Sequence, residues 1–182
     1  MTQVGQMSQY LRNKTKGGCW VFTSCVETPE DFALTDHIDQ LRASFYCVMR
    51  ARPWHIDAIT VLPDRIQTVW TLPGGDDDYS GRWAAIKANF SRNLPKTEYI
   101  SSVRARRDER GIWQRGFFEQ EIYDPRERDA MRWRCYRLPV LLGVAKSPED
   151  WPYSSYHRDQ RLGLVETLPE QPENPRTAIR VA

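Results

Sequence analysis

Two polar side chains stand where a short strand would present them to one ligand. Ile56–Leu62 and Ile66–Leu72 are rich in Ile, Val, Thr and Trp and predict two central strands joined by a Pro-Asp turn. Because side chains two apart on a strand share a face, Arg65 and Gln67 should lie side by side where the second strand starts. Two histidines at this spacing could hold a metal ion. Arginine repels a metal, and glutamine offers at best a weak oxygen ligand.

The remaining segments must form the layers that position this hairpin. The first half of the chain predicts a strand at Cys19–Val26, a helix of about four turns that Thr35 caps and that ends before Pro53, and then the hairpin. The second half predicts a helix at Tyr79–Leu94 behind a PGGDDD turn that should supply its N-cap, a strand or irregular segment at Ile112–Ile122, and a helix at about 126–138 opened by Asp124-Pro125. This order predicts an α+β fold of the ferredoxin-like type, an antiparallel central sheet with helices packed on it.

Three further features complete the expected organisation. We expect Lys96–Arg110 to be a polar loop, Pro139 to kink or break the last helix, and an aromatic segment after Trp151 to end at His157-Arg158. Residues 10–164 should form one domain, and 165–182 a loose tail that is rich in Pro and Glu.

Composition excludes several classes of protein and leaves nucleic-acid binding open. The net charge of +2 does not itself indicate a partner, but five Arg against two acidic residues in Arg104–Arg115 favour contact with phosphate. Four scattered Cys without a CxxC pair argue against a zinc knuckle and for reduced thiols in the cytoplasm. A polar N-terminus and short apolar runs indicate neither a signal peptide nor a membrane span.

Five stretches in the same order resemble one family, the REP-associated tyrosine transposases, which are bacterial relatives of the single-tyrosine HUH transposases. They are Gly17-Gly18 followed by an aromatic strand, VLPD and WTLP around the second hairpin strand, GDDDYSGRWAAIK, GIWQRGFFE and DWPYSSYHRD. The resemblance covers roughly residues 10–164 and implies the HUH-type version of the ferredoxin-like fold.

The resemblance also shows where this chain departs from the family's chemistry. In the family, a His-hydrophobic-His pair holds Mg or Mn, a Tyr on a later helix attacks the DNA phosphate, and an Asn one turn further lies beside the metal. The matching positions here are Arg65, Gln67, Arg134 and Leu138, the last two located by the Pro-Val and Gly that follow. Leucine has no ligand atom, and arginine is not a usable nucleophile. The resemblance therefore implies no intact catalytic set and no metal cofactor.

Two alternatives stay open. Tyr136 could replace the missing nucleophile together with Asp64 and Gln67, giving an active strand-transfer enzyme with a rearranged site. It lies about 200° around the helix from Arg134, however, so it should face away and pack against the sheet or sit on the surface. A scaffold that has lost DNA binding and now binds a protein is the other alternative.

The resemblance implies single-stranded or hairpin DNA as the partner, namely the repeated extragenic palindrome with a short 5′ tetranucleotide. Cations at family-like positions that suit phosphate are Lys14, Lys16, Arg65, Arg82, Lys87, Arg115, Arg134, His157 and Arg158. Arginines at both Arg65 and Arg134 would turn a metal pocket into a phosphate-binding one. We therefore predict a DNA-binding, nucleoid-associated protein without cleavage activity; its oligomeric state and target sequence stay open.

Structural alternatives exist for several of these cations. Arg82 and Lys87 could form only the solvated face of a helix, and His157-Arg158 could cap the sheet. Trp83, on the apolar stripe of the same helix, should be a core residue rather than a stacking platform. Arg128 and Arg132 form a like-charged i,i+4 pair, and an acidic partner would relieve their repulsion.

Overall fold

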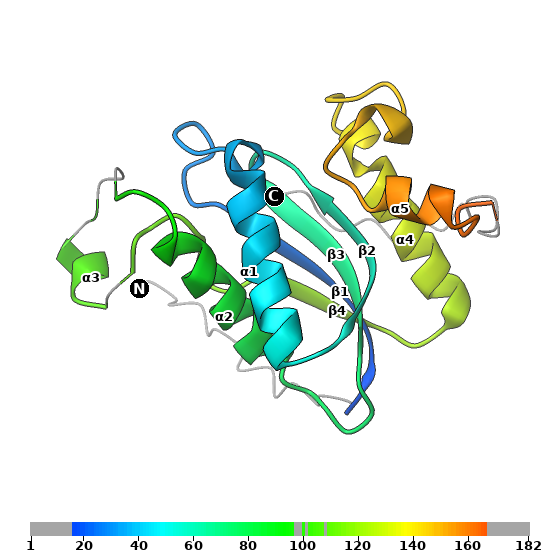
Figure 1. The fold of residues 1–182 in the computed structure, drawn as a ribbon, viewed down its shortest axis with the longest axis horizontal. Coiled ribbons are helices and arrows are strands. Elements are labelled where there is room, and N and C mark those ends of the chain that lie inside the picture. The colour runs from blue at the N-terminus through cyan, green and yellow to red at the C-terminus, as the bar shows by residue number, and fades with distance from the viewer. Residues whose placement is uncertain (1–15, 97–99, 101, 108, 167–182) are drawn as a thin grey trace, which may run out of the picture.

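The computed structural model describes residues 16–96, 100, 102–107 and 109–166. Within them, four antiparallel strands form one sheet in the order β2-β3-β1-β4 (Figure 1). The elements are β1 (Gly18–Cys25), the 3-10 turn η1 (Leu34–His37), α1 (Ile38–Ala51), β2 (His55–Val61), β3 (Arg65–Leu72), α2 (Tyr79–Arg92), α3 (Ser102–Ala105), β4 (Phe118–Ile122), α4 (Pro125–Leu141), the 3-10 turn η2 (Pro148–Asp150) and α5 (Tyr156–Arg161). The predicted α+β fold is confirmed. Lys14 and the predicted tail from residue 167 onward lie outside the described residues.

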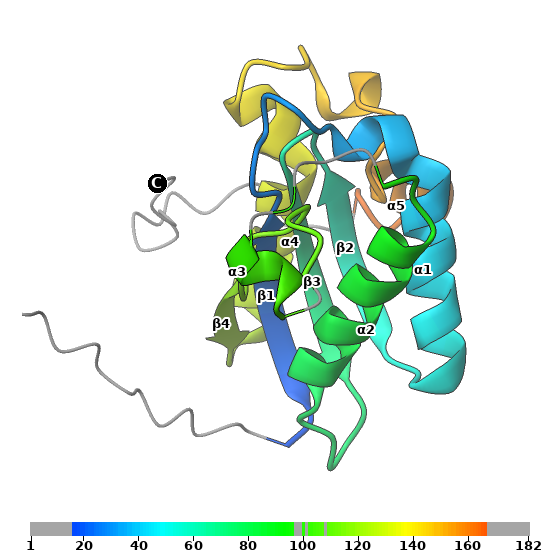
Figure 2. The ribbon, with the colours of Figure 1, turned by 90° about the vertical axis from the view of Figure 1, so that its left-hand side faces the viewer.

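Helices cover both faces of the sheet. Helices α1 and α2 pack side by side on one face, and α4 and α5 lie on the other (Figures 1 and 2). The first face is aromatic: the ring centroids of Trp70 and Trp83 are 4.9 Å apart with planes at 16°, and Phe22 lies 4.7 Å from Trp70. The other core contains Val69 and Cys135. Trp83 is fully buried, so its predicted core role is confirmed.

The hairpin forms as predicted, but β2 is an edge strand rather than a central one. The segment 151–155 covers its outer edge: Val61 N donates to Tyr153 O (2.9 Å), and Ser155 N donates to Ile59 O (2.8 Å). This pairing protects an edge that would otherwise offer unpaired backbone groups to another chain. The central strands are β1 and β3, because β1 pairs with β3 on the side away from β2, and β4 pairs with β1.

The helix ends show which local signals decide a boundary. Asp78 caps α2 by accepting from Gly81 N (2.9 Å), as the acidic turn predicted. Thr35 is not the N-cap of α1; it lies in η1, and His37 precedes α1. Pro139 does not break α4, which continues to Leu141. It stands in the last turn, where the missing backbone N–H removes only one helical hydrogen bond.

The predicted strand or irregular segment at Ile112–Ile122 contains both forms: Phe118–Ile122 is extended, and the part before it is irregular and meets the end of β1 through a Val26–Trp113 bridge. Two other segments differ from their predicted form. The polar loop before Ile112 contains the short helix α3. The aromatic segment after Trp151 continues into α5 instead of ending at His157-Arg158. None of the described helices is long and apolar enough to cross a membrane.

Candidate nucleic-acid interface

Arg65 opens β3, where a neighbouring carboxylate holds its guanidinium. Its Nε and Nη2 donate to Asp64 Oδ2 at 2.9 and 2.7 Å, and this hydrogen bond raises the pKa of Arg65. The side chain is 21% exposed, and Nη1 makes no hydrogen bond to any described residue. One edge of the guanidinium is therefore fixed by the protein, and the other can still meet an anion.

Gln67 lies in a buried polar row beneath α4. Its register partners are Thr60 on β2 and Thr23 on β1, so the three side chains share one face of the sheet. Gln67 Oε1 and Thr23 Oγ1 are buried and lack a hydrogen-bond partner among the described residues. The Cys135 thiol donates to the Gln67 carbonyl (3.2 Å), and burial raises its pKa to about 12, which keeps it protonated. Position 67 is thus closed off by α4.

The donors at this place do not fit the divalent ion that the resemblance implies. Arg65 carries a positive charge, Leu138 is buried and apolar, and Gln67 offers only a neutral amide. In the part of the chain that the structure describes, no group of three or more His, Cys, Asp or Glu could hold a metal ion. We therefore assign no reaction step to a metal at this site.

Arg134 lies on the turn of α4 that packs over β3. The next residue, Cys135, contacts the Gln67 backbone, so α4 carries position 134 to the region of the sheet where β3 begins. The Nε of Arg134 is buried without a hydrogen-bond partner in the described residues. That Arg65 and Arg134 together grip one phosphate stays a prediction.

Tyr136 is fully buried on the same helix. Its hydroxyl donates to Asp159, and its ring makes an edge contact with Tyr156 at 5.6 Å. Burial, and next the bond to Asp159, raises the pKa of Tyr136. Of the two expected positions for Tyr136, packed inside the fold or on the surface, the structure shows the first. In this position the phenol is held neutral and away from solvent, which is the opposite of an activated nucleophile.

Arg82 is the largest departure from the predicted set of phosphate contacts. Its side chain is 2% exposed rather than on a solvated helix face, and its guanidinium forms a bidentate pair with Asp76 at 2.9 and 2.6 Å. Further donors reach backbone carbonyls of Arg52 and Pro53 (3.3 and 3.1 Å). The expectation of a surface side chain is wrong, and we remove Arg82 from the proposed DNA contacts.

Several other predicted cations also have partners within the protein. Arg115 pairs with Glu109 at 3.0 Å but stays 55% exposed. His157 Nε2 lies 2.9 Å from the Trp151 carbonyl, and Arg158 forms two parallel hydrogen bonds with Asp159.

Two further arginines of the Arg104–Arg115 run also bind groups within the protein. Arg104 pairs with Glu27, and Arg110 binds the carbonyls of Leu94 and Pro95 after the end of α2. Arg106 and Arg107 are exposed, as is Lys16 before β1.

Lys87 lies in a groove of about 630 Å³ between α2 and the segment before β4. Its ammonium donates to the carbonyls of Gln114 and Gly116 (3.1 and 2.5 Å) and lies 5.5 Å from the Trp113 ring centroid. Arg115 lines the same groove. Cations beside partly buried aromatic side chains, here Trp113 and Phe117, suit single-stranded nucleic acid.

The ammonium of Lys87 should titrate at an unusually low pH. Burial lowers its pKa to about 8, because the charged form loses hydration. In an NMR titration of the lysine side chains, we expect one resonance to titrate near pH 8 and to be absent from the Lys87→Arg variant. If all lysine resonances titrate near the ordinary value of about 10.4, this environment is misdescribed.

The structure separates the predicted cations into two groups on opposite faces of the sheet. Lys87 and Arg115 belong to the α2 side, whereas Arg134 and Arg158 belong to the α4 and α5 side (Figure 2). The second group includes two arginines that were not predicted as site residues, Arg128 and Arg132. Their i,i+4 spacing is visible in the sequence, but the sequence does not show that β2 and α5 pack beside them.

Two proteins and one solved structure of a single family are similar to this chain over most of its length. No family model matches the chain. It is 38% identical over 159 residues to a protein of Haemophilus influenzae (strain ATCC 51907 / DSM 11121 / KW20 / Rd) assigned to the REP-associated tyrosine transposases, covering 87% of this chain and 90% of that protein. It is 36% identical over 158 residues to the REP-associated tyrosine transposase of Escherichia coli (strain K12), covering 87% and 88%. A solved REP-associated tyrosine transposase bound to a REP hairpin is similar at a TM-score of 0.73 and 36% identity, covering 87% of this chain and 88% of that one.

Proposed function

Because the chain belongs to the family of REP-associated tyrosine transposases, we propose that it binds hairpin or single-stranded DNA without cleaving it by the family's tyrosine and metal chemistry. The observation that carries the proposal is the replacement of the reactive groups by guanidinium groups, Arg65 at the start of β3 and Arg134 on α4. In the cytoplasm such a protein would associate with the nucleoid as a binder or regulator.

Charge and geometry support phosphate binding in place of catalysis. Arg65 keeps a free guanidinium edge beside its bond to Asp64, and Arg134 has a buried Nε without a partner in the described residues. A planar guanidinium binds phosphate through two parallel hydrogen bonds, and its charge occupies the place of a cation. The solved relative is bound to a REP hairpin, which supports a hairpin of this type as the probe.

Incubation with a REP-type hairpin and Mg²⁺ or Mn²⁺ tests the loss of cleavage. We expect a complex whose affinity falls steeply with added salt, because phosphate contacts release counterions. On a denaturing gel we expect no covalent protein–DNA adduct. A tyrosyl adduct that Tyr136→Phe abolishes would instead identify an active enzyme with a rearranged site. Absence of salt-dependent DNA binding would favour a protein-binding scaffold.

Replacing Arg65 and Arg134 together by alanine should weaken hairpin binding by about 30- to 1,000-fold. Each lost hydrogen bond to a charged group removes about 1 to 2 kcal/mol of binding energy. The slope of log affinity against log salt should also fall by about two. The matched control is Arg42→Ala with Arg50→Ala, which removes two exposed charges from α1 on the other face. Equal affinities for the two double variants would refute the phosphate pocket.

A further inference from the structure

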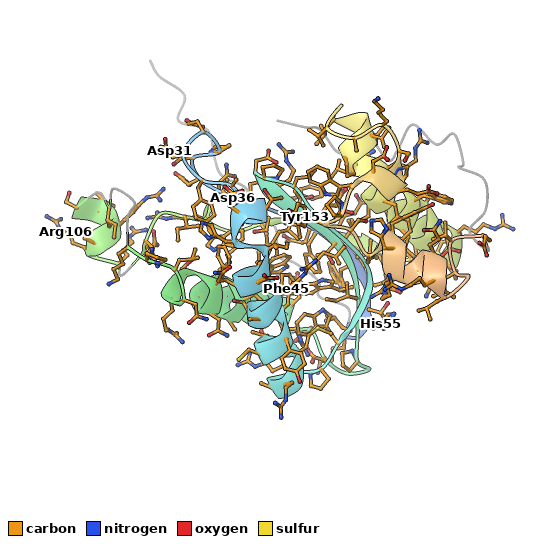
Figure 3. All side chains as sticks on the ribbon, turned by 45° about the horizontal axis from the view of Figure 1, so that its top comes forward. Asp31, Asp36, Phe45, His55, Arg106 and Tyr153 are labelled. Carbon is orange, nitrogen blue, oxygen red and sulfur yellow. The ribbon has the colours of Figure 1, made fainter. Side chains whose placement is uncertain are left out.

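A second basic pocket opens on the α4 face, away from the start of β3. It has a volume of about 330 Å³ and lies between the start of β2, the first half of α4, and α5. Its lining residues are His55, Asp57, Arg128, Arg132, Arg158, Asp159, Leu162 and Leu164. His55 lies at the edge of the sheet next to α4 and α5, whereas Arg106 lies on the opposite side of the molecule (Figure 3).

The carboxylates of this pocket are already engaged. Asp159 is 1% exposed and accepts from Arg158 Nε and Nη2 at 2.7 and 3.0 Å. Asp57 accepts from the Thr71 hydroxyl at 2.7 Å, and its other oxygen lies 4.0 Å from His55 Nε2. Two carboxylates thus face three arginines. Asp159 is bound by Arg158, whereas Asp57 accepts from a neutral hydroxyl and keeps its charge, so the arginines of the lining exceed its carboxylates by one positive charge.

Arg128 is the arginine that lacks a partner. Among the described residues its side chain makes no hydrogen bond or ion pair, and its Nε is buried. Arg132 has long ion pairs, at 3.5 Å from Asp129 and 4.0 Å from Asp159, and a hydrogen bond with the Tyr136 hydroxyl, but its Nε is also buried without a partner among the described residues. The two guanidinium groups repel each other across one helical turn. Buried unpaired donors are rare in native proteins, and the Nε groups of Arg128 and Arg132 both lack an acceptor among the described residues.

We propose that this pocket binds a backbone phosphate of the DNA, with Arg128 and Arg132 as its ligands. A phosphodiester supplies the negative charge and the acceptor oxygens that the two guanidinium groups need. The assignment rests on the proposed function and extends it. Arg128 and Arg134 are six residues apart, about 9 Å along the helix axis, so the two positions contact different phosphates of the bound strand.

A matched pair of variants on α4 tests the site. Arg128→Gln should lower hairpin affinity by about 5- to 10-fold and reduce the salt slope by about one. Arg126→Gln should leave both unchanged, because Arg126 is exposed on the same helix and outside the pocket. Arg128→Lys keeps the charge but loses the fork, so an intermediate affinity is expected. Equal melting temperatures of the variants and the wild type would show that the fold is kept.

Neutral methylphosphonate linkages in the hairpin make the test specific. One linkage should weaken binding to the wild type and have no further effect on Arg128→Gln, which assigns that phosphate to Arg128. If Arg128→Gln binds as tightly as Arg126→Gln, or no linkage couples to it, the second phosphate site is refuted.

Inorganic phosphate separates failure of this site from failure of the proposed function. If the wild type does not bind the hairpin, DNA binding is wrong, but phosphate should still shift the Nε–Hε NMR resonances of Arg128 and Arg132. That shift should be absent from Arg128→Gln and unchanged in Arg126→Gln. If phosphate shifts neither resonance in the wild type, the anion site is refuted whatever the hairpin does.

Discussion

Replacing Arg82 by methionine should lower the free energy of unfolding by about 3 to 5 kcal/mol and leave the hairpin affinity of the folded protein unchanged. The guanidinium is 2% exposed and forms a bidentate pair with Asp76. The same side chain donates to three backbone carbonyls and lies 5.5 Å from the Trp54 ring centroid. Methionine fills similar space but leaves these acceptors without donors, which is costly in a buried site.

Denaturant unfolding of the variant measures this loss. The control is Arg92→Met, since Arg92 is exposed on the same helix and its loss should change stability by no more than about 0.5 kcal/mol. A variant of Arg82 that is as stable as this control would show that the buried pair contributes nothing. A variant that keeps its stability but loses hairpin affinity would return Arg82 to the DNA contacts.

The pair with Arg82 also predicts a dependence of stability on pH. The hydrogen bond from Arg82 lowers the pKa of Asp76 below its usual value of 3.8. A lowered carboxyl pKa stabilises the fold above the unfolded-state pKa, and this contribution is lost as the pH falls through the folded-state value. In acid denaturation below about pH 4, the stability difference between wild type and Asp76→Asn should therefore shrink.

Replacing Asp159 by asparagine should lower the free energy of unfolding by about 2 to 4 kcal/mol. This carboxylate is 1% exposed and receives two bonds from Arg158, its neighbour on α5, and one from Tyr136, which joins α5 to α4. The estimate is below that for Arg82 because Arg158 is 41% exposed and can turn to water. Thermal unfolding measures the effect, and the exposed Asp36→Asn is the control.

A double-mutant cycle with Tyr136→Phe assigns part of this loss to the hydroxyl. We expect a coupling free energy of about 1 kcal/mol or more, since the two groups share a hydrogen bond in a buried site. Additive effects would mean that the bond contributes little and that Asp159 acts through Arg158. If Tyr136 acts only in stabilising the fold, the Tyr136→Phe variant should bind the hairpin as tightly as the wild type.

Local patterns were sufficient for those parts of the fold that depend on neighbouring residues. Alternating β-branched and aromatic residues predicted the β2–β3 hairpin, and the acidic turn predicted the cap at Asp78. The strand at Cys19–Val26 was right within one residue. These features depend on side-chain period and on hydrogen bonds that reach three residues or fewer, so the chain itself contains their cause.

Features that depend on distant segments were not predictable in the same way. Arg82 lies beside the apolar stripe of α2, and nothing local shows that Asp76 and the carbonyls after α1 would enclose it. The edge position of β2 depends on the pairing of β1 with β3, and the cover of its outer edge depends on the 151–155 segment, about 90 residues away. Burial of a charged side chain requires partners that only the assembled fold supplies.

The sequence alone predicted the order of the main elements and the family resemblance, and from that resemblance the expectation that Arg65, Gln67, Arg134 and Leu138 replace the family's imidazole, phenol and amide groups. Only the tertiary structure decided which arginines are consumed by internal ion pairs and which keep unpaired donors: Arg82 belongs to the first kind, and Arg128 to the second. The reason is that residue identity sets the charge of a side chain, whereas its freedom to bind an external phosphate depends on every group that packs around it.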